Sequence, residues 1–404
     1  MLINFFVVAI SMKFLHMADC HVGGWREEKL NQLSIEHFRK TIDAALNENV
    51  GFVLISGDLF DVAMPGFEII NEVAKELSRL KEGNVDVYII PGSHDYSVSG
   101  KTALNILESA GLCVNVYKIN DNELELFEDK TGVKITGILG RRGGLEKEDY
   151  KKINKTNLEK ENGFKIFMFH TALEEFKPKD LENVECTSYL NLPKNFNYYA
   201  GGHVHYLFDI DKENYGKIVY PGPLFPNNFK EIEELKRGSF CVVDEKLNLE
   251  RKYLEIKKGV MSFTISGTIP NEINNKIEKI IESNDFLDKI VTLRIIGELE
   301  TGNTSDVKLK EFTKKIEEKG AFYVMKNTNK LKLKEFEEIR LEGEVKDIEK
   351  ELIKSNLGQF KIENEEMLTN ELMELFSVEK LEGETNSVFE IRVINAALKS
   401  LRLE

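Results

Sequence analysis

The stretch Val53-Leu54-Ile55-Ser56-Gly57-Asp58-Leu59-Phe60-Asp61 decides the fold. Its apolar start is typical of a buried strand, and a glycine and two aspartates follow directly. Four further apolar runs also end in His or Asp, leading into Asp19-Cys20-His21, Gly92-Ser93-His94-Asp95, His170 and Gly201-Gly202-His203-Val204-His205. In α/β proteins, sites form outside the carboxyl ends of strands, so we expect these side chains to share one crevice.

The spacing and chemistry of these residues predict a two-metal site. Asp19 and His21 are two residues apart, as are His203 and His205, so in extended chain each pair points to one face. Five of the seven histidines of the chain lie in these motifs. Imidazole and carboxylate ligands suit manganese, iron or zinc. Two such ions about 3.5–4 Å apart can clamp a phosphoryl group and activate a water, which indicates a phosphoesterase.

Other residues near the motifs have simpler explanations. A lone histidine at a strand end is usually a hydrogen-bonded surface group, and only the ordered set of motifs favours a site. We expect structural roles for His16, which lies within the first strand, and for His37, which lies within a helix. Cys20 faces away from its neighbours and is expected to pack. Asp61 and Asp95 are predicted to orient a ligand or a loop rather than to bind metal.

The first 255 or so residues alternate strand-like runs with amphipathic helical stretches, a pattern that predicts an α/β sandwich. Strands are expected at 13–18, 51–56, 85–90, 133–138 and 164–169, and helices at 33–47 and 68–80. A change near Lys257-Lys258-Gly259 begins a small α+β unit. We expect its strands at 261–266, 290–296 and 321–325, and its helices from Pro270 and at 307–318. Beyond residue 335 two apolar helical stripes stand out, comprising Leu368, Leu372 and Leu375, and Ile391, Ile394, Leu398 and Leu401.

Composition sets the broad class. The 404 residues are 42% hydrophobic and 31% charged, as in folded globular proteins. The net charge of −14 argues against a generally basic nucleic-acid coat, but bound cations can reverse a local field. Four scattered cysteines indicate reduced thiols and a cytoplasmic location. Residues 1–11 are apolar but too short to span a membrane and unlike a signal peptide, so we expect translation to start at Met12.

The ordered set D-x-H, G-D-x-x-D, G-S-H-D, a lone H and G-H-x-H resembles the calcineurin-like metallophosphoesterases over residues 12–255. Within them the chain resembles the SbcD-type nucleases of DNA double-strand-break repair. The opening motif Asp19-Cys20-His21-Val22-Gly23 carries their Gly after the His. Tyr220-Pro221-Gly222-Pro223 and Lys236-Arg237-Gly238-Ser239-Phe240 resemble the segment that closes their catalytic domain.

This resemblance implies a two-sheet sandwich flanked by helices (12–255), an α+β capping domain (256–334) and a helical C-terminal region (335–404), with an SbcC-type coiled-coil ATPase as partner. The apolar stripes of that region fit docking on this ATPase, and intramolecular packing or a solvated acidic tail explains them equally well. It implies DNA ends as substrate, exonuclease and possible endonuclease activity, two divalent ions (most commonly Mn²⁺), and a homodimer formed by helices in the 68–110 region. One ion would be held by Asp19, His21, Asp58 and His205. The other would be held by Asp58, Ser93, His170 and His203. His94 would act as general acid or as stabiliser of the transition state.

Two departures from the family pattern keep alternatives open. Ser93 stands where Asn is usual, and its hydroxyl is a shorter and weaker ligand; Pro223 stands where Ser is more usual. A small-molecule or nucleotide phosphodiesterase on the same scaffold is the second hypothesis. A DNA-binding scaffold with weak catalysis, motivated by Ser93, is the third. Candidate contacts to a DNA backbone are Arg141, Arg142, Lys151 and Lys152, although a solvated surface explains each of them as well.

Overall fold

The computed structural model describes residues 12–97, 100–178, 184–334, 364–378, 380 and 386–401. The chain divides into two compact units, Met1–Leu333 and Lys334–Glu404. The predicted start at Met12 concerns residues 1–11, which lie outside the described residues. Within the described parts of the chain, every helix is too short or too polar to span a lipid bilayer.

The first sheet has six strands in the order β16-β15-β1-β2-β3-β4. Strands β1 to β4 run parallel, and β15 joins them antiparallel to β1. The bounds are β1 (Phe14–Met17), β2 (Phe52–Ser56), β3 (Asp86–Ile90), β4 (Val114–Asn115), β15 (Arg237–Val243) and β16 (Leu249–Glu255). The apolar runs of β1, β2 and β3 are almost wholly buried, as expected for parallel strands covered on both faces.

The second sheet also has six strands, in the order β13-β14-β12-β9-β8-β7. Strands β14, β12, β9 and β8 are parallel, and β13 and β7 close the edges antiparallel. The bounds are β7 (Phe127–Glu128), β8 (Lys134–Ile138), β9 (Lys165–His170), β12 (Tyr198–Gly202), β13 (Phe208–Lys212) and β14 (Gly216–Tyr220). Two short pairs lie outside it: β5 (Ile119–Asn120) with β6 (Glu123–Leu124), and β10 (Ala172–Leu173) with β11 (Cys186–Thr187).

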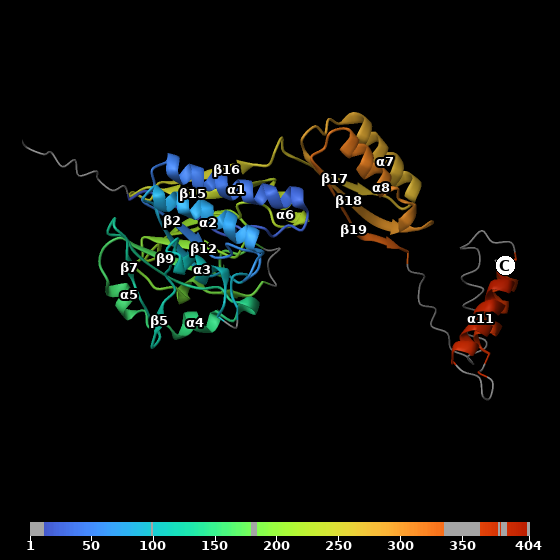
Figure 1. The fold of residues 1–404 in the computed structure, drawn as a ribbon, viewed down its shortest axis with the longest axis horizontal. Coiled ribbons are helices and arrows are strands. Elements are labelled where there is room, and N and C mark those ends of the chain that lie inside the picture. The colour runs from blue at the N-terminus through green and yellow to red at the C-terminus, as the bar shows by residue number, and fades with distance from the viewer. Residues whose placement is uncertain are drawn as a thin grey trace, which may run out of the picture. The chain divides into compact units, whose positions relative to one another are not determined.

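Three apolar layers hold the sandwich together. Phe14, Leu54 and Ile90 of the first sheet pack against Ile166 and Tyr198 of the second. The outer face of the first sheet is covered by α1 (Glu28–Asn47), α2 (Phe67–Glu82) and α3 (Ala103–Ser109). Helices α4 (Lys147–Lys152) and α5 (Thr156–Lys160) cover the second sheet, and in Figure 1 they lie on the side of the domain opposite to α1. The predicted α/β sandwich is confirmed, and its five predicted strands lie within one residue of their expected bounds.

A third, parallel sheet follows in the order β17-β18-β19. Its elements are β17 (Val260–Ser266), α7 (Pro270–Ser283), β18 (Ile290–Leu299), α8 (Leu309–Glu318) and β19 (Tyr323–Leu333). Helices α7 and α8 cover one face of the sheet through an apolar core of their own (Figure 1). Strand β19 extends to Leu333, well past the predicted end at 325, because it pairs with β18 along almost the whole length of both strands.

The remaining helices are α6 (Phe229–Leu235), between β14 and β15, and α10 (Glu365–Phe376) and α11 (Asn386–Ser400) in the second unit. Short 3-10 turns lie at Arg142–Gly144, Tyr189–Asn191 and Thr304–Asp306. The two apolar stripes predicted beyond residue 335 fall on α10 and α11, with Leu401 directly after α11.

Candidate metal centre

The side chains predicted to bind metal lie at the carboxyl ends of five strands, three from the first sheet and two from the second. They follow β1, β2 and β3 in one sheet and end or follow β9 and β12 in the other. Within the described residues, three groups of possible ligands have atoms within 4.8 Å of one another. These groups are Asp19, His21 and His205; His21, Asp58 and His94; and Asp58, His170 and His203.

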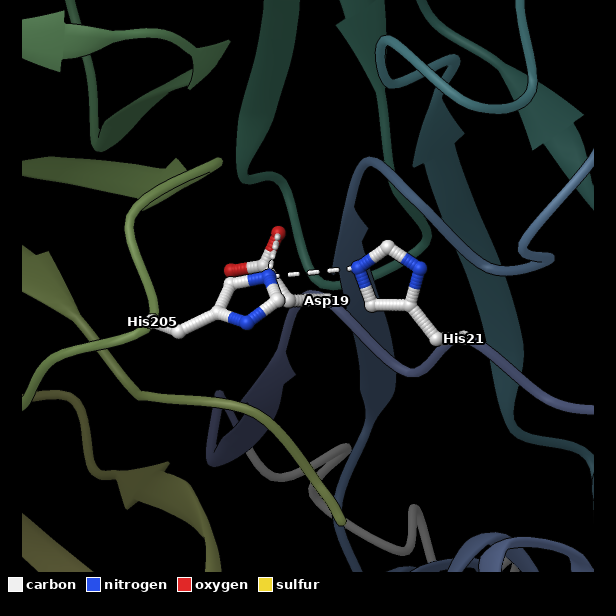
Figure 2. A group of neighbouring side chains, drawn as sticks. All are labelled: Asp19, His21 and His205. Carbon is white, nitrogen blue, oxygen red and sulfur yellow. Dashed lines mark hydrogen bonds and ion pairs between the residues drawn. The ribbon is translucent and has the colours of Figure 1, made fainter. Parts of the chain in front are cut away.

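The first group joins both sheets. Figure 2 shows the rings of His21 and His205 facing each other beside the carboxylate of Asp19. His21 Nε2 lies 3.2 Å from His205 Nε2, and His205 Nε2 lies 3.9 Å from Asp19 Oδ1. Asp19 and His21 are almost fully buried. The three side chains therefore converge on one point, although about 180 residues separate the first two from the third.

Asp58 is the shared member of the other two groups. Its Oδ2 lies 3.1 Å from His170 Nε2 and 3.8 Å from His21 Nε2. Ser93 donates from Oγ to the same oxygen at 3.3 Å, and the backbone N–H of His94 donates to Oδ1 at 2.7 Å. Asp58 thus occupies the middle of the cluster.

Surrounding groups fix the orientation of several imidazole rings. His170 donates from Nδ1 to the carbonyl oxygen of Ser56 at 2.8 Å, and His94 donates from Nδ1 to the carbonyl oxygen of Asp61 at 2.7 Å. In the neutral form of both rings the lone pair therefore lies on Nε2. The carboxylate of Asp61 lies 3.2 Å from His21 Nδ1.

Asp95 does not join the ligand groups. Its buried carboxylate accepts three backbone hydrogen bonds, from Leu59 at 3.1 Å, Phe60 at 3.0 Å and Gly92 at 3.1 Å. It therefore ties the loop that carries Asp58 to the loop after β3.

Four of the proposed ligands have a backbone conformation that residues other than glycine rarely adopt. Asp19, His21, Asp58 and His203 all have positive φ, at 50°, 41°, 49° and 91°. Such conformations cluster at functional sites, where the surrounding structure holds them in place. Gly57 has φ 87°, and a Cβ there would lie 2.1 Å from His170 Nδ1, so glycine is required at this position.

The buried charges shift the pKa values of the histidines. Burial alone would lower the pKa of His170, but the charge of Asp58 and its hydrogen bond raise it to about 10. For His205 burial acts in the same way, and the hydrogen bond with Glu231 raises its pKa to about 9. Burial and the nearby charge of His170 lower the pKa of His203 to about 3. A bound cation would therefore displace the protons that His170 and His205 hold, whereas His203 is already neutral at pH 7.

The unpaired atoms fit a divalent cation. In the described part of the chain, the buried Oδ2 of Asp19 has no hydrogen-bond partner. The Nδ1 atoms of His21 and His205 face the carboxylates of Asp61 and Glu231. Their two Nε2 atoms therefore lie 3.2 Å apart, a contact that requires either a proton between them or a bound cation. Imidazole nitrogen and carboxylate oxygen form the donor set that Mn, Fe and Zn accept.

The histidines and the cysteine for which we expected structural roles lie outside these groups. His16 Nδ1 is 2.9 Å from the hydroxyl of Tyr198, and His37 donates from Nδ1 to the carbonyl oxygen of Leu224 at 2.8 Å. Cys20 is buried in the core against α1 and α2.

Sequence reasoning missed Glu231. Its Oε1 lies 2.9 Å from His205 Nδ1, and it comes from α6, which no motif singled out. The one local signal is the Asn228-Phe229-Lys230-Glu231 pattern, which resembles a helix capping box. That pattern predicts a helix start but says nothing about a histidine 26 residues away.

Comparison with known proteins agrees with this geometry. Residues 12–207 match the family model described as calcineurin-like phosphoesterase. A DNA double-strand break repair protein Mre11 from Thermoplasma acidophilum is 28% identical over 70% of this chain and 77% of its own length. The Mre11 protein of Methanococcus maripaludis is 32% identical over 56% of this chain and 61% of its own length.

Among solved structures, a dimetal phosphatase from Danio rerio matches 61% of this chain and 96% of its own, with 12% identity and a TM-score of 0.37. That likeness is too low to bear on function. The family match and the grouped ligands together make this a divalent-metal-binding phosphoesterase. Residues 12–207 therefore match the calcineurin-like phosphoesterase family, and the chain is similar to archaeal Mre11 proteins over more than half of its length.

Proposed function

We propose that the chain is a metal-dependent nuclease that hydrolyses phosphodiester bonds at DNA ends during double-strand-break repair. The observation that carries the proposal is Asp58, which belongs to two of the three ligand groups at the edge where the sheets meet. A shared carboxylate is what a pair of close metal ions requires. The names of the Mre11 relatives supply the substrate, and exonuclease activity with endonuclease cleavage near the same ends is the form we expect.

The proposed ion sites share Asp58. Asp19, His21, Asp58 and His205 hold one ion, and Asp58, Ser93, His170 and His203 hold the other. Bound there, divalent ions (Mn²⁺ first, with Fe or Zn as alternatives) supply the Lewis acidity that activates water and neutralises the phosphodiester. Ser93 is the weakest of these ligands, since its hydroxyl already donates to Asp58.

His94 is the proposed catalytic residue. Its ring is held through Nδ1 by the carbonyl oxygen of Asp61, and its side chain is 41% exposed. Nε2 is therefore free and accessible to a substrate. A protonated Nε2 donates to the leaving oxygen, and a hydrogen bond from it stabilises charge on the phosphoryl oxygens. Asp61 and Asp95 position this ring and the Asp58 loop without binding metal.

The domain proposal retains the predicted bounds, with a nuclease domain at 12–255, a capping domain at 256–334 and an ATPase-docking region at 335–404. The exposed apolar side chains of α10 and α11, among them Phe376, Ile391 and Ile394, support docking on an SbcC-type coiled coil.

A homodimer is supported by four apolar side chains near the starts of α2 and α3. They are Val62, Met64, Phe67 and Ile106, which are 44%, 52%, 85% and 47% exposed. With no disulfide among its cysteines, we place the protein in the cytoplasm.

The four basic side chains proposed to contact the DNA backbone differ in their surroundings. Arg141 already pairs with Asp149 at 3.0 Å, and Lys151 pairs with Glu148 at 2.9 Å. Arg142 and Lys152 are exposed and remain the better candidates. Recognition would rest on phosphates and shape more than on base sequence.

The test is Mn²⁺-dependent degradation of an end-labelled duplex, with a chromogenic phosphodiester assayed in parallel. Loss of duplex degradation in His94→Ala, with metal content unchanged, would support the nuclease. Hydrolysis of only the small ester would favour a small-molecule phosphodiesterase. Duplex binding with turnover that His94→Ala does not change would favour a weakly catalytic scaffold.

A further inference from the structure

Glu231 is placed against the far side of the ring of His205. Its Oε1 accepts a hydrogen bond from His205 Nδ1 at 2.9 Å, while Nε2 of the same ring faces His21 and Asp19. The side chains of Glu231 and His205 are only 16% and 20% exposed. A carboxylate that binds Nδ1–H fixes the ring rotation and leaves the Nε2 lone pair directed into the site.

The carboxylate of Glu231 is itself held in one orientation. Its Oε2 accepts from the backbone N–H of Asn227 at 2.7 Å, and its Oε1 also accepts from the Asn228 side chain. The backbone N–H of Glu231 in turn donates to Asn228 Oδ1 at 3.0 Å, which starts helix α6. Both oxygens of the carboxylate therefore face hydrogen-bond donors.

Helix α6 is also fixed from its other side. Glu233 accepts from Arg294 Nε at 3.0 Å and from Thr292 Oγ1 at 3.3 Å, and both donors lie on β18. The guanidinium of Arg294 stacks 5.0 Å from the ring centre of Phe229 at the start of α6. Ile232 is fully buried in the apolar cluster that contains Ile290 of β18. The helix that carries Glu231 is therefore held by β18 on one side and contacts His205 through Glu231 itself.

We propose that Glu231 is a positioning residue of the metal centre, which holds His205 in the tautomer and rotation needed to bind the ion shared with Asp19 and His21. This inference rests on the proposed function, because it assumes that His205 is a ligand. Glu231 does not touch the substrate or the ion, and it acts through the histidine alone. The carboxylate is required at this position because a glutamine would place its NH₂ group against a donor in either orientation.

The substitution Glu231→Gln tests the charge and the acceptor geometry with almost no change in size. Loss of such a partner of a ligating histidine typically weakens metal binding about 10–100-fold. Glu231→Asp keeps the charge on a shorter side chain and should recover part of the affinity. Glu234→Gln is the matched control, because Glu234 lies on the same helix, is 57% exposed and has only Lys230, at 3.8 Å, as its ion-pair partner among the described residues.

The measurement is calorimetric titration of Mn²⁺ into the metal-free full chain, with circular dichroism to verify folding. We expect Glu231→Gln to weaken one binding step about 10–100-fold and to leave the other step nearer the wild-type value, with Glu234→Gln unchanged. Wild-type affinity for both steps in Glu231→Gln would overturn the inference, as would an equal loss in Glu234→Gln. If Glu231→Gln does not fold, Glu231→Asp is the test, because its shorter side chain changes the contact with His205 Nδ1. Wild-type Mn²⁺ affinity of the Glu231→Asp variant would then overturn the inference.

Failure of the proposed function gives a different result. A wild-type chain that takes up no Mn²⁺, Fe²⁺ or Zn²⁺ would refute the metal-dependent nuclease and this inference together. A wild-type chain that binds two ions, with an unchanged Glu231→Gln variant, would refute the positioning role alone.

Discussion

Replacement of Gly92 by alanine should disable the metal centre without unfolding the protein. Gly92 lies two residues after β3, and its φ is not in the left-handed region, so its own backbone tolerates alanine. A Cβ at this position would lie 2.2 Å from both the backbone nitrogen and Oδ1 of Asp58. The added methyl group therefore collides with the residue that the two proposed ion sites share.

The size of the displacement follows from the geometry. Contacts to Cβ essentially never fall below 3.0 Å, so Asp58 or Gly92 must move by at least the missing 0.8 Å. Metal–ligand distances tolerate only about 0.2 Å, so a carboxylate shifted this far no longer binds both ions. We expect Mn²⁺ affinity to fall on the order of 100-fold at both steps, the upper end of the range for perturbed metal environments. Overpacking of this kind costs about 1–3 kcal/mol of stability, which a typical folded domain survives.

The assay is Mn²⁺ titration by calorimetry, together with metal content by mass spectrometry and thermal melting. Gly66→Ala is the matched control, because no heavy atom lies within 4 Å of a Cβ at that position. Wild-type stoichiometry and affinity in Gly92→Ala would refute the placement of Asp58 as a fixed, shared ligand. An equal loss in Gly66→Ala would show that the effect has nothing to do with Asp58.

Three further outcomes follow. His94→Ala should lower turnover about 10²–10⁴-fold with both ions retained, and loss of metal in that variant would show that His94 is a ligand. Ser93→Asn should tighten the second Mn²⁺-binding step, because a carboxamide oxygen reaches further than the hydroxyl, and an unchanged isotherm would contradict this. Burial and the charge of Arg251 lower the pKa of His16 to about 3. Since an unfolded histidine titrates near 6.5, the folded state loses stability as pH falls below that value, by roughly 2 kcal/mol down to pH 5. Urea unfolding at pH 7 and pH 5 should show a smaller loss in His16→Gln, and equal losses would refute the assignment.

The sequence carries most of the information on the sandwich and its ligands because both depend on local patterns. Strands such as β2 are continuous apolar runs buried on both faces, and each ligand follows its strand within a few residues. Glu231 was beyond such reasoning, since its role depends on where α6 docks and no period links it to His205. The length of β19 was also missed, because residues 326–330 are polar and owe their conformation to pairing with β18.

The positive φ angles of the ligand residues are maintained by hydrogen bonds between the loops that carry them. Asp19, His21 and Asp58 each adopt a conformation that costs an L residue about 1–2 kcal/mol. Backbone hydrogen bonds offset part of this cost, from Asp19 to Gly57 at 3.1 Å and from His21 to Asp58 at 3.0 Å. These bonds join the loops after β1 and β2, so each loop keeps the other in its strained backbone conformation. Because the parallel strands fix where both loops begin, the ligands are preorganised before any ion binds, and binding energy is not spent on ordering them. The same rigidity makes the centre sensitive to a single added methyl group at Gly92.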